Sequence, residues 1–252
     1  MPRQKYTYAQ QQCVRAAGRL SQMTGMLEPN ARVGVAVSGG MDSFVLLEVM
    51  RIRQGIVPFP FSIMALHVNP GFEPESHAPL TKWLEENGVA GHLEVTDYGP
   101  RAHSPENRKA SACFFCAMLR RKRLFELCRE YNLTHLAFGH TADDLVANFF
   151  MNLCQNGRVD GMSMREPFFG GKLMVIRPLM LVEKKIIAKA ARDWRLPIWA
   201  NACPSSGVTK RKTIMDDIAR MTRDHKGMDT KIRAALCRWQ VSLTPGNAED
   251  TP

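Results

Sequence analysis

Apolar and amphipathic segments alternate along most of the chain. Short apolar segments predict β-strands at Arg32–Val37, Phe61–Val68, His92–Thr96, Thr134–Phe138 and Leu173–Arg177. The segments between them carry apolar residues at helical spacing and predict helices at Asp42–Gln54, Ala78–Asn87, Phe114–Tyr131 and Thr141–Gln155, the last with Thr141 as its candidate cap. Residues 97–112 and 156–171 are predicted to be long loops. This order predicts an α/β fold, a doubly wound parallel sheet of about five strands, with ligands bound beyond the carboxyl ends of the strands.

Helical patterns also precede and follow the predicted sheet. They cover residues 8–27 before it and Val182–Trp194, Thr209–His225 and Asp229–Val241 after it. No internal repeat or low-complexity linker separates these parts. We therefore expect an N-terminal helical segment at residues 1–30 and an α/β domain at residues 31–200. Residues 201–252 would form a cysteine-containing loop and helices packed on the same domain.

The composition is that of a globular protein with an excess of positive charge. Of 252 residues, 45% are hydrophobic and 23% are charged, which excludes disordered, collagen-like and coiled-coil classes. The 34 Lys and Arg residues against 24 Asp and Glu give a formal charge of +10, which favours a phosphate-bearing partner or an anionic membrane surface. The odd count of 7 cysteines and the lack of a signal peptide or an apolar membrane span favour a cytoplasmic protein with no membrane partner.

A glycine-containing turn lies between the first predicted strand and the helix that follows it. Its sequence, Ser38-Gly39-Gly40-Met41-Asp42-Ser43, combines glycines, hydroxyl donors and a carboxylate at a helix N-terminus, where free amides attract anions. Phosphate is therefore the expected ligand, and Asp42 would hold Mg²⁺ or cap the helix. The alternative is a tight turn without a ligand. Neither a G-x-x-x-x-G-K-[ST] motif nor a G-x-G-x-x-G motif is present, which excludes a Walker ATPase and a dinucleotide dehydrogenase.

Cysteines mark a second candidate site. Cys113 and Cys116 form a C-x-x-C pair at the start of a basic helix, and the pair is compatible with a redox dithiol, half of a zinc site or an iron-sulfur site. Cys203 lies in a loop beside Pro and Ser. Three such cysteines can hold a cubane cluster that leaves one iron without a protein ligand. The remaining cysteines, Cys13, Cys128, Cys154 and Cys237, are expected to be small core residues.

Two further groups of residues are candidates for the same edge of the sheet. The segment Gly139–Asp144 ends a predicted strand and starts a helix, so its histidine and carboxylates would face the glycine turn, unless the carboxylates only complement the helix dipole. Arg177 would neutralise phosphate or stabilise a strand end. Basic clusters at Arg120–Arg123, Lys210–Lys212 and Arg220–Arg223 would contact an RNA backbone, although each alone is compatible with a solvated helix face.

Together these motifs resemble the tRNA 2-thiocytidine synthetase family (TtcA) of the adenine-nucleotide α-hydrolase superfamily. The resemblance spans about residues 30–220 and includes the motifs at Ser38–Ser43, Cys113–Cys116, Gly139–Asp144, Gly157–Met162, Ile176–Leu179 and Asn201–Cys203. Met41 stands where many members have lysine. The resemblance implies a Rossmann-like PP-loop ATPase fold that uses ATP and Mg²⁺.

The resemblance also implies roles for individual residues. It implies a [4Fe-4S] cluster on Cys113, Cys116 and Cys203, with Asp42 and Asp143 joining these cysteines as catalytic residues. It implies a nucleotide site made by Ala36, Ser38, Gly39, Gly40, Asp42, Ser43, His67, Gly139, His140 and Asp144.

The activity implied by the resemblance is ATP-dependent thiolation of tRNA. A base carbonyl, expected at cytidine C2, would be adenylated, and sulfur from sulfide or a cysteine desulfurase would replace its oxygen. A homodimer is suggested by the resemblance alone. The alternatives are a related enzyme that adenylates another RNA position or a small molecule, a lysidine-synthase-like ligase, and a non-catalytic RNA-binding or redox-sensing protein. The C-x-x-C pair with Cys203 disfavours the ligase, which needs no cluster.

Overall fold

The computed structural model describes residues 5–108, 111–200, 202–205, 207 and 210–244. Its strands are β1 (Arg32–Ala36), β2 (Ser62–Asn69), β3 (Ala90–Val95), β4 (His135–Ala137), β5 (Arg165–Phe168) and β6 (Leu173–Ile176). Its helices are α1 (Tyr8–Thr24), α2 (Met41–Gln54), the 3-10 turn η1 (Pro74–His77), α3 (Ala78–Asn87), α4 (Tyr98–Ala102), α5 (Ala112–Glu130), α6 (Ala142–Asn156), α7 (Lys184–Asp193), α8 (Lys210–Thr222) and α9 (Met228–Ser242).

The strands form one sheet in the order β3-β2-β1-β4-β6-β5. The five predicted strands are all present and pair in parallel, so the predicted α/β fold with a parallel sheet is confirmed. The structure adds β5, which pairs antiparallel with β6 at the edge of the sheet. Its sequence, Arg-Glu-Pro-Phe, has no apolar alternation, which is why the pattern alone predicted a loop there.

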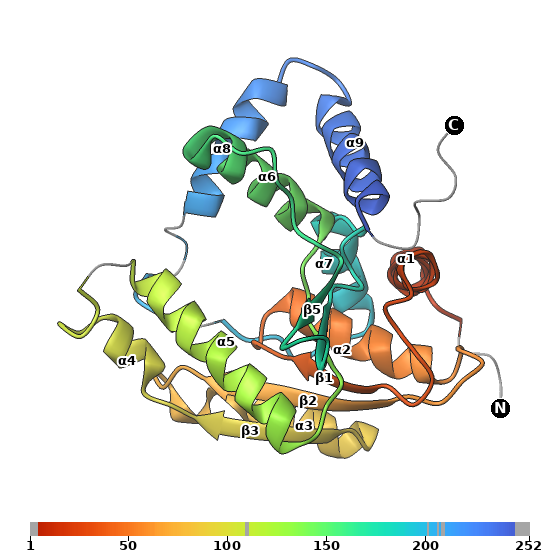
Figure 1. Ribbon diagram of the computed structural model, residues 1–252, viewed down its shortest axis with the longest axis vertical. Helices are drawn as coiled ribbons and strands as arrows, with labels where there is room; N and C mark the ends of the chain where they lie inside the picture. Colours follow the sequence, from red (N-terminus) through yellow and green to blue (C-terminus); the bar gives the residue numbers. More distant parts are fainter. Residues whose placement is uncertain (1–4, 109–110, 201, 206, 208–209, 245–252) are drawn as a thin grey trace.

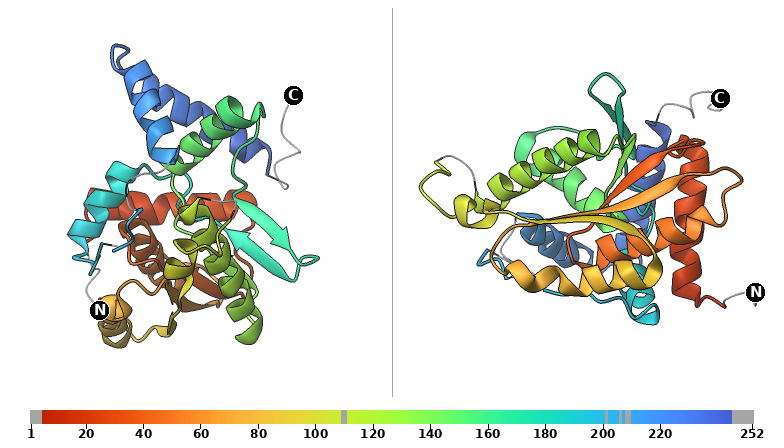
Figure 2. Two further views of the ribbon diagram at one scale, coloured as in Figure 1. Left: turned by 90° about the vertical axis from the view of Figure 1, so that its left-hand side faces the viewer. Right: turned by 90° about the horizontal axis from the view of Figure 1, so that it is seen from below.

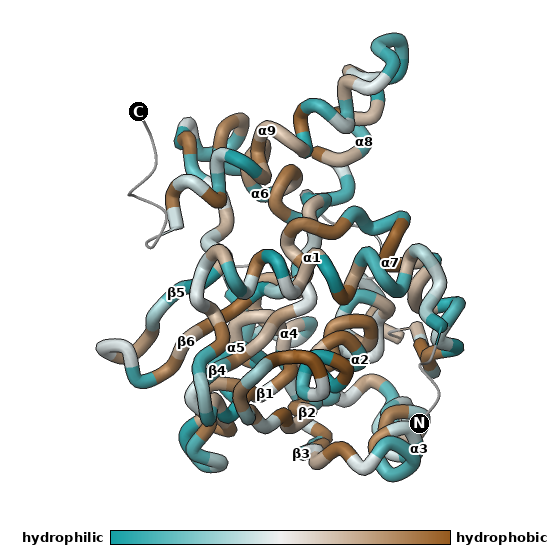
Figure 3. Tube along the Cα trace, turned by 90° about the vertical axis from the view of Figure 1, so that its right-hand side faces the viewer, coloured by the Kyte–Doolittle hydropathy of each residue, from teal (hydrophilic) through white to brown (hydrophobic). Residues whose placement is uncertain are grey.

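Helices cover the two faces of the sheet unequally (Figure 2). On one face α1, α2, α3 and α7 pack together over the sheet and form the larger core, which includes Phe44, Leu46 and Ile187. On the other face α5 packs over the centre, and a smaller core forms from Leu66, Leu124, Leu127, Leu136 and Val175. Hydrophobic residues gather along the central strands and the helices that pack on them, whereas the turn between α8 and α9 is hydrophilic (Figure 3).

The C-terminal helices stand beyond the sheet rather than on it. Helices α8 and α9 pack against α6, where Val146 meets Ile214 and Ile218 in a small apolar cluster (Figure 1). The predicted helix at Thr209–His225 begins outside the described residues. The division of the chain into segments 1–30, 31–200 and 201–252 stays a prediction. None of the helices in the described part of the chain is both long and apolar enough to cross a lipid bilayer.

The start of α6 confirms a local prediction. Thr141 is the N-cap residue, and its side chain and that of Asp144 form a reciprocal capping box. The long predicted loop at 97–112 contains a short helix, α4, and α5 begins at Ala112, so both cysteines of the C-x-x-C pair lie in the first turns of that helix.

Candidate functional site

The carboxyl ends of the parallel strands bring the sequence motifs to one edge of the sheet. Ser38 follows β1, His67 lies near the end of β2, and His140 follows β4. Gly139 approaches the start of α2 so closely that a β-carbon there would lie 2.9 Å from the Asp42 backbone. The Ser38–Ser43 turn and the Gly139–Asp144 segment therefore share one crevice, as the topology of a parallel sheet requires.

The glycine turn is held by its own side chains. The Ser38 amide donates to Ser43 Oγ at 3.0 Å, and that hydroxyl donates to the Gly40 carbonyl at 2.8 Å. Gly39 has φ +88°, and a β-carbon there would lie 2.3 Å from the Trp199 ring, so only glycine fits. Gly40 is the N-cap residue of α2 and has no side chain to cap the helix. The first amides of α2 are therefore available to an anion.

Asp42 and Asp143 share one lysine. Lys184 Nζ lies 3.3 Å from Asp42 Oδ2, and the Lys184 amide donates to Asp143 Oδ2 at 2.7 Å. Burial raises the pKa of Asp42 despite this ammonium. Asp42 Oδ1 is shielded from solvent and has no hydrogen-bond partner within the described part of the chain. An unpartnered carboxylate oxygen at a phosphate-binding turn is suited to Mg²⁺.

Asp144 is a capping residue in this structure. Its Oδ2 accepts from the amide and the hydroxyl of Thr141, both at 2.9 Å, and its Oδ1 lies 2.8 Å from Arg211. Burial alone would raise the pKa of Asp144, but Arg211, the Thr141 hydrogen bonds and the nearby His140 together lower it. These contacts fit the structural alternative for this carboxylate, and its role toward a nucleotide stays a prediction.

Two neutral histidines face the crevice. His67 Nδ1 lies 2.8 Å from the Val37 carbonyl and therefore carries the proton, and its Nε2 has no partner among the described residues. Burial lowers the pKa of His67 to about 4. Burial, followed by the charge of Arg177, also lowers the pKa of His140 to about 4. Both rings are uncharged at neutral pH, so each can accept a hydrogen bond at its unprotonated nitrogen.

Arg177 stabilises a strand end. Its guanidinium donates to the Ser163 carbonyl and lies 3.4 Å from Glu166 Oε2. These contacts favour the structural alternative over a phosphate contact.

Arg120 links the glycine turn to the cysteines. It lies on α5, and its Nε is shielded from solvent without a hydrogen-bond partner in the described ranges. Burial lowers the pKa of Arg120, and Cys116 opposes that shift. A small pocket of about 10 Å³ is lined by Ser38, His67, Asn69, Arg120, Trp199 and Ala202. The turn that would hold phosphate and the loop that carries Cys203 therefore meet at one partly buried cation.

The three candidate cysteines lie near one another. Cys113 and Cys116 follow the Ser111 N-cap of α5, and Cys113 Sγ lies 4.0 Å from the Ser205 carbonyl in the loop of Cys203. Burial raises the pKa of Cys116, Arg120 opposes this, and the thiols of Cys203 and Cys113 raise it further. His103 Nε2, 3.8 Å from Cys203 Sγ, is a neighbour that the sequence did not indicate.

Thiolate sulfur is the ligand that an iron-sulfur cluster takes from a protein. No three His, Cys, Asp or Glu side chains in the described ranges are grouped closely enough to enclose one metal ion. A zinc ion requires each sulfur at about 2.3 Å, whereas a cubane distributes its cysteines over separate irons. Cys116, with Cys113 and Cys203 near it, interacts with the partly buried cation of Arg120, which also suits an anionic group. The donor set therefore fits a [4Fe-4S] cluster with three protein ligands.

The other cysteines mostly behave as expected. Burial raises the pKa of Cys13 and Cys128 to about 12 and that of the partly buried Cys237 to about 11, so these thiols are unreactive. The expectation for Cys154 is wrong, because its side chain is exposed near the end of α6.

The predicted basic clusters divide into residues with different surroundings. Arg123 pairs with Glu94 and Glu130, each at 2.7 Å, and Arg211 pairs with Asp144, whereas Arg121 and Lys122 are exposed. Arg220 pairs with Asp217. Many residues of these clusters are therefore exposed to solvent or ion-paired on a helix face. The side chain of Lys210 lies outside the described part of the structure.

Several residues of the crevice were not predicted. Lys184, Trp199 and Arg233 come from the C-terminal part of the chain, and Arg233 joins the site through Asp143 at 3.4 Å and Glu183 at 3.1 Å. Nothing in the sequence distinguishes Lys184 from the neighbouring Lys185. Asn201, part of the Asn201–Cys203 motif, lies outside the described residues.

Comparisons with known proteins agree with this geometry. The sequence pattern of the PP-loop domain family matches residues 12–214. A tRNA-cytidine(32) 2-sulfurtransferase of Geobacter sulfurreducens is 29% identical over 223 residues, which cover 88% of this chain and 87% of the relative. The Pseudomonas putida enzyme of that name is 32% identical over 226 residues, covering 88% and 81%.

A solved structure supports the fold. The U34-tRNA thiolase NcsA from Methanococcus maripaludis, solved with its [4Fe-4S] cluster, superposes with a TM-score of 0.72 at 23% identity. The match covers 92% of this chain and 80% of that one.

Proposed function

The chain belongs to the PP-loop family and, within it, to the tRNA-cytidine(32) 2-sulfurtransferases, and on this premise we propose that it uses ATP to replace the O2 oxygen of cytidine 32 in tRNA with sulfur. The observation that carries the proposal is the meeting of the Ser38–Ser43 turn and the loop of Cys203 at the partly buried Arg120. One site thereby offers both an anion-binding turn and three cysteine ligands.

The glycine turn and the start of α2 bind the phosphates of ATP. The uncapped amides of α2 and the hydroxyls of Ser38 and Ser43 donate to phosphate oxygens. The open Oδ1 of Asp42 contributes to Mg²⁺ binding. The backbone of Lys184 is held by Asp143, and its ammonium turns from Asp42 toward the phosphates. It thereby supplies a positive charge near the turn, where Met41 has none.

The reaction then proceeds in two displacements. The O2 oxygen of the base attacks the α-phosphorus, and pyrophosphate leaves. Amides and cations that already face the phosphates stabilise the charge that develops there without reorganising. A hydrosulfide next attacks C2 of the base, the C–O bond breaks, and AMP leaves with that oxygen.

The cysteine site serves the second displacement. When a [4Fe-4S] cluster is bound by Cys113, Cys116 and Cys203, the iron without a protein ligand supplies a binding place for sulfide. Arg120 holds compensating positive charge between this place and the phosphate turn. The neutral His67 offers its unprotonated Nε2 as a hydrogen-bond acceptor beside the phosphate-binding turn. Sulfide or a cysteine desulfurase provides the sulfur, and the reaction takes place in the cytoplasm.

Anaerobic turnover tests the proposal. The iron-loaded protein is incubated with ATP, Mg²⁺, sulfide and a tRNA transcript, and 2-thiocytidine and pyrophosphate are quantified. One pyrophosphate per thiolated base is expected, and a transcript with uridine at position 32 should give no 2-thiocytidine. Pyrophosphate release without thiolation would instead indicate an adenylating enzyme with another acceptor. Neither product would indicate a non-catalytic relative.

A further inference from the structure

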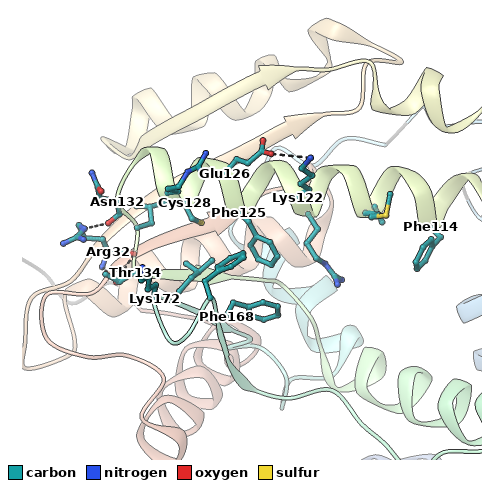
Figure 4. Close-up of a pocket in the computed structure, with 17 residues that line it drawn as sticks. Arg32, Phe114, Lys122, Phe125, Glu126, Cys128, Asn132, Thr134, Phe168 and Lys172 are labelled. Carbon is teal, nitrogen blue, oxygen red and sulfur yellow. Dashed lines mark hydrogen bonds and ion pairs between the residues drawn. The ribbon is translucent and has the colours of Figure 1, made fainter. Parts of the chain in front are cut away.

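A large groove lies on the face of the sheet that carries α5. It has a volume of about 990 Å³ and runs along α5 toward the β5–β6 hairpin (Figure 4). One stripe of α5 lines it, with Phe114, Met118, Arg121, Phe125 and Arg129 spaced three or four residues apart. We call this feature the α5 groove. It is separate from the small pocket between the glycine turn and the cysteine loop.

The α5 groove exists because no second helix covers this face. In the described part of the chain, the smaller core is formed by α5 over β2, β4 and β6, with Tyr98 of α4 packed against it, and no helix covers the β6–β5 side. Phe125 and Phe168 point toward one another across the groove, with ring centroids 5.2 Å apart (Figure 4). Phe114 and Phe169 are 65% and 60% exposed at its margins. Aromatic rings exposed to this extent are available to a partner.

The charge of the α5 groove is strongly positive. Five cations, Arg32, Arg121, Lys122, Arg129 and Lys172, line it together with a single carboxylate, Glu126. Lys122 lies 4.0 Å from that carboxylate, and Arg123, which does not line the groove, lies 3.4 Å from it. Arg121, Arg129 and Lys172 make no ion pair with any residue that the structure describes. Exposed aromatic rings interleaved with unpaired cations are the surface that single-stranded nucleic acid binds, through base stacking and phosphate contacts.

We propose that the α5 groove binds the unpaired nucleotides that flank the modified base of the tRNA substrate. The proposal rests on the proposed function and assigns a place to its substrate. Phe114 directly follows Cys113, so one end of the groove opens at the cysteines. A strand lying in the groove therefore leads its next base to the place where phosphate and sulfur meet.

The same charge pattern argues against a second copy of the chain as the occupant. A two-fold symmetric contact would place this patch against itself and bring its cations together. RNA phosphates instead neutralise them, with release of counterions.

Binding of tRNA to the iron-loaded protein tests this proposal without relying on turnover. Phe169→Ala removes one stacking surface, and the double variant Arg129→Glu/Lys172→Glu reverses two cations. The matched control is Arg15→Glu, an exposed residue of α1 on the opposite face. Fluorescence anisotropy with labelled tRNA, over a range of salt concentrations, gives the dissociation constants.

We expect Phe169→Ala to raise the dissociation constant for tRNA about tenfold. The double variant should lose more, and its salt dependence should fall by about 0.7 in log–log slope for each cation that meets a phosphate. The control should bind tRNA as the wild type does, and all three variants should retain ATP binding.

Two outcomes would overturn the proposal. If the wild type thiolates tRNA and the groove variants bind tRNA as tightly as it does, the RNA binds elsewhere and the proposed function is unaffected. A wild-type dimer that dissociates in the groove variants, measured by sedimentation, would assign the groove to a second copy. A wild type that binds tRNA through the groove but releases no pyrophosphate would contradict the proposed function and keep the groove.

Discussion

The glycine turn and the cysteine site are built in opposite ways. In the turn, Ser38, Gly40 and Ser43 hold one another through hydrogen bonds that span five residues or fewer. In the cysteine site, Cys113 meets the Ser205 carbonyl at 4.0 Å and Cys203 meets His103 at 3.8 Å, across 92 and 100 positions of the chain. The turn is complete as folded, whereas the thiols need a ligand to join them.

This difference separates two kinds of pre-organisation. A turn fixed by short-range hydrogen bonds loses its conformational entropy during folding, so its amides bind phosphate without a further loss of entropy in the turn. A site assembled from distant loops gains part of its order from the group that it binds. Substitutions in the turn should therefore weaken ATP binding without changing the iron content. Substitutions of the cysteines should lower the iron content without changing ATP binding.

Loss of Cys203 should give the largest effect. Cys203→Ala removes the ligand that comes from the distant loop, so iron should fall from about four per chain to near zero, and thiolation should fall at least a hundredfold. ATP binding should remain within about twofold of the wild type. Iron and acid-labile sulfide analysis, with isothermal titration of ATP, measures both. Cys154→Ala, at an exposed cysteine on α6, is the control and should keep its iron. Full iron in Cys203→Ala would refute the three-cysteine site.

Acid should destabilise the crevice through His67. Because its pKa is about 4 in the folded protein and near 6.5 when unfolded, the unfolded chain binds more protons as pH falls below 6.5. The stability that His67 contributes is fully present above pH 6.5 and is lost as pH falls toward 4. At pH 5 the free energy of unfolding should be lower by about 2 kcal/mol than at neutral pH.

Urea unfolding at pH 7 and pH 5 measures this effect. His67→Gln keeps a side-chain donor for the Val37 carbonyl but does not titrate, so its stability should depend less on pH than that of the wild type. The neighbours His77 and Arg120 are the same in both proteins and act on the wild-type ring in the same direction as burial. An equal pH dependence in the two proteins would exclude His67 as the source.

The smallest effect should come from Lys184. Lys184→Gln removes the ammonium beside Asp42 but keeps the backbone amide that binds Asp143, so KM for ATP should rise about tenfold while iron content stays constant. Steady-state pyrophosphate release measures KM. Lys189→Gln, an exposed lysine of the same helix, is the matched control. An equal rise of KM for ATP in Lys189→Gln would show that the overall positive charge, and not the position of Lys184, determines KM.

Local patterns identified the strands and the motifs that lie on them. Apolar runs predicted five strands, and the cap at Thr141 followed from its place before an amphipathic run. The same reasoning failed for β5, whose polar sequence becomes a strand only by pairing with β6. It also failed for Cys154, because helical spacing does not state which face of α6 is covered.

The sequence by itself determined the alternating strands and helices of the α/β fold, the glycine turn and the C-x-x-C pair, because each depends on residues within a few positions of one another. Only the tertiary structure decided that Lys184 would face Asp42, that Arg120 would lie partly buried between turn and cysteines, and that the α5 groove would stay open. These features arise where segments far apart in the chain pack together. Such packing depends on which surfaces remain to be buried once the sheet has formed, and no local pattern contains that information.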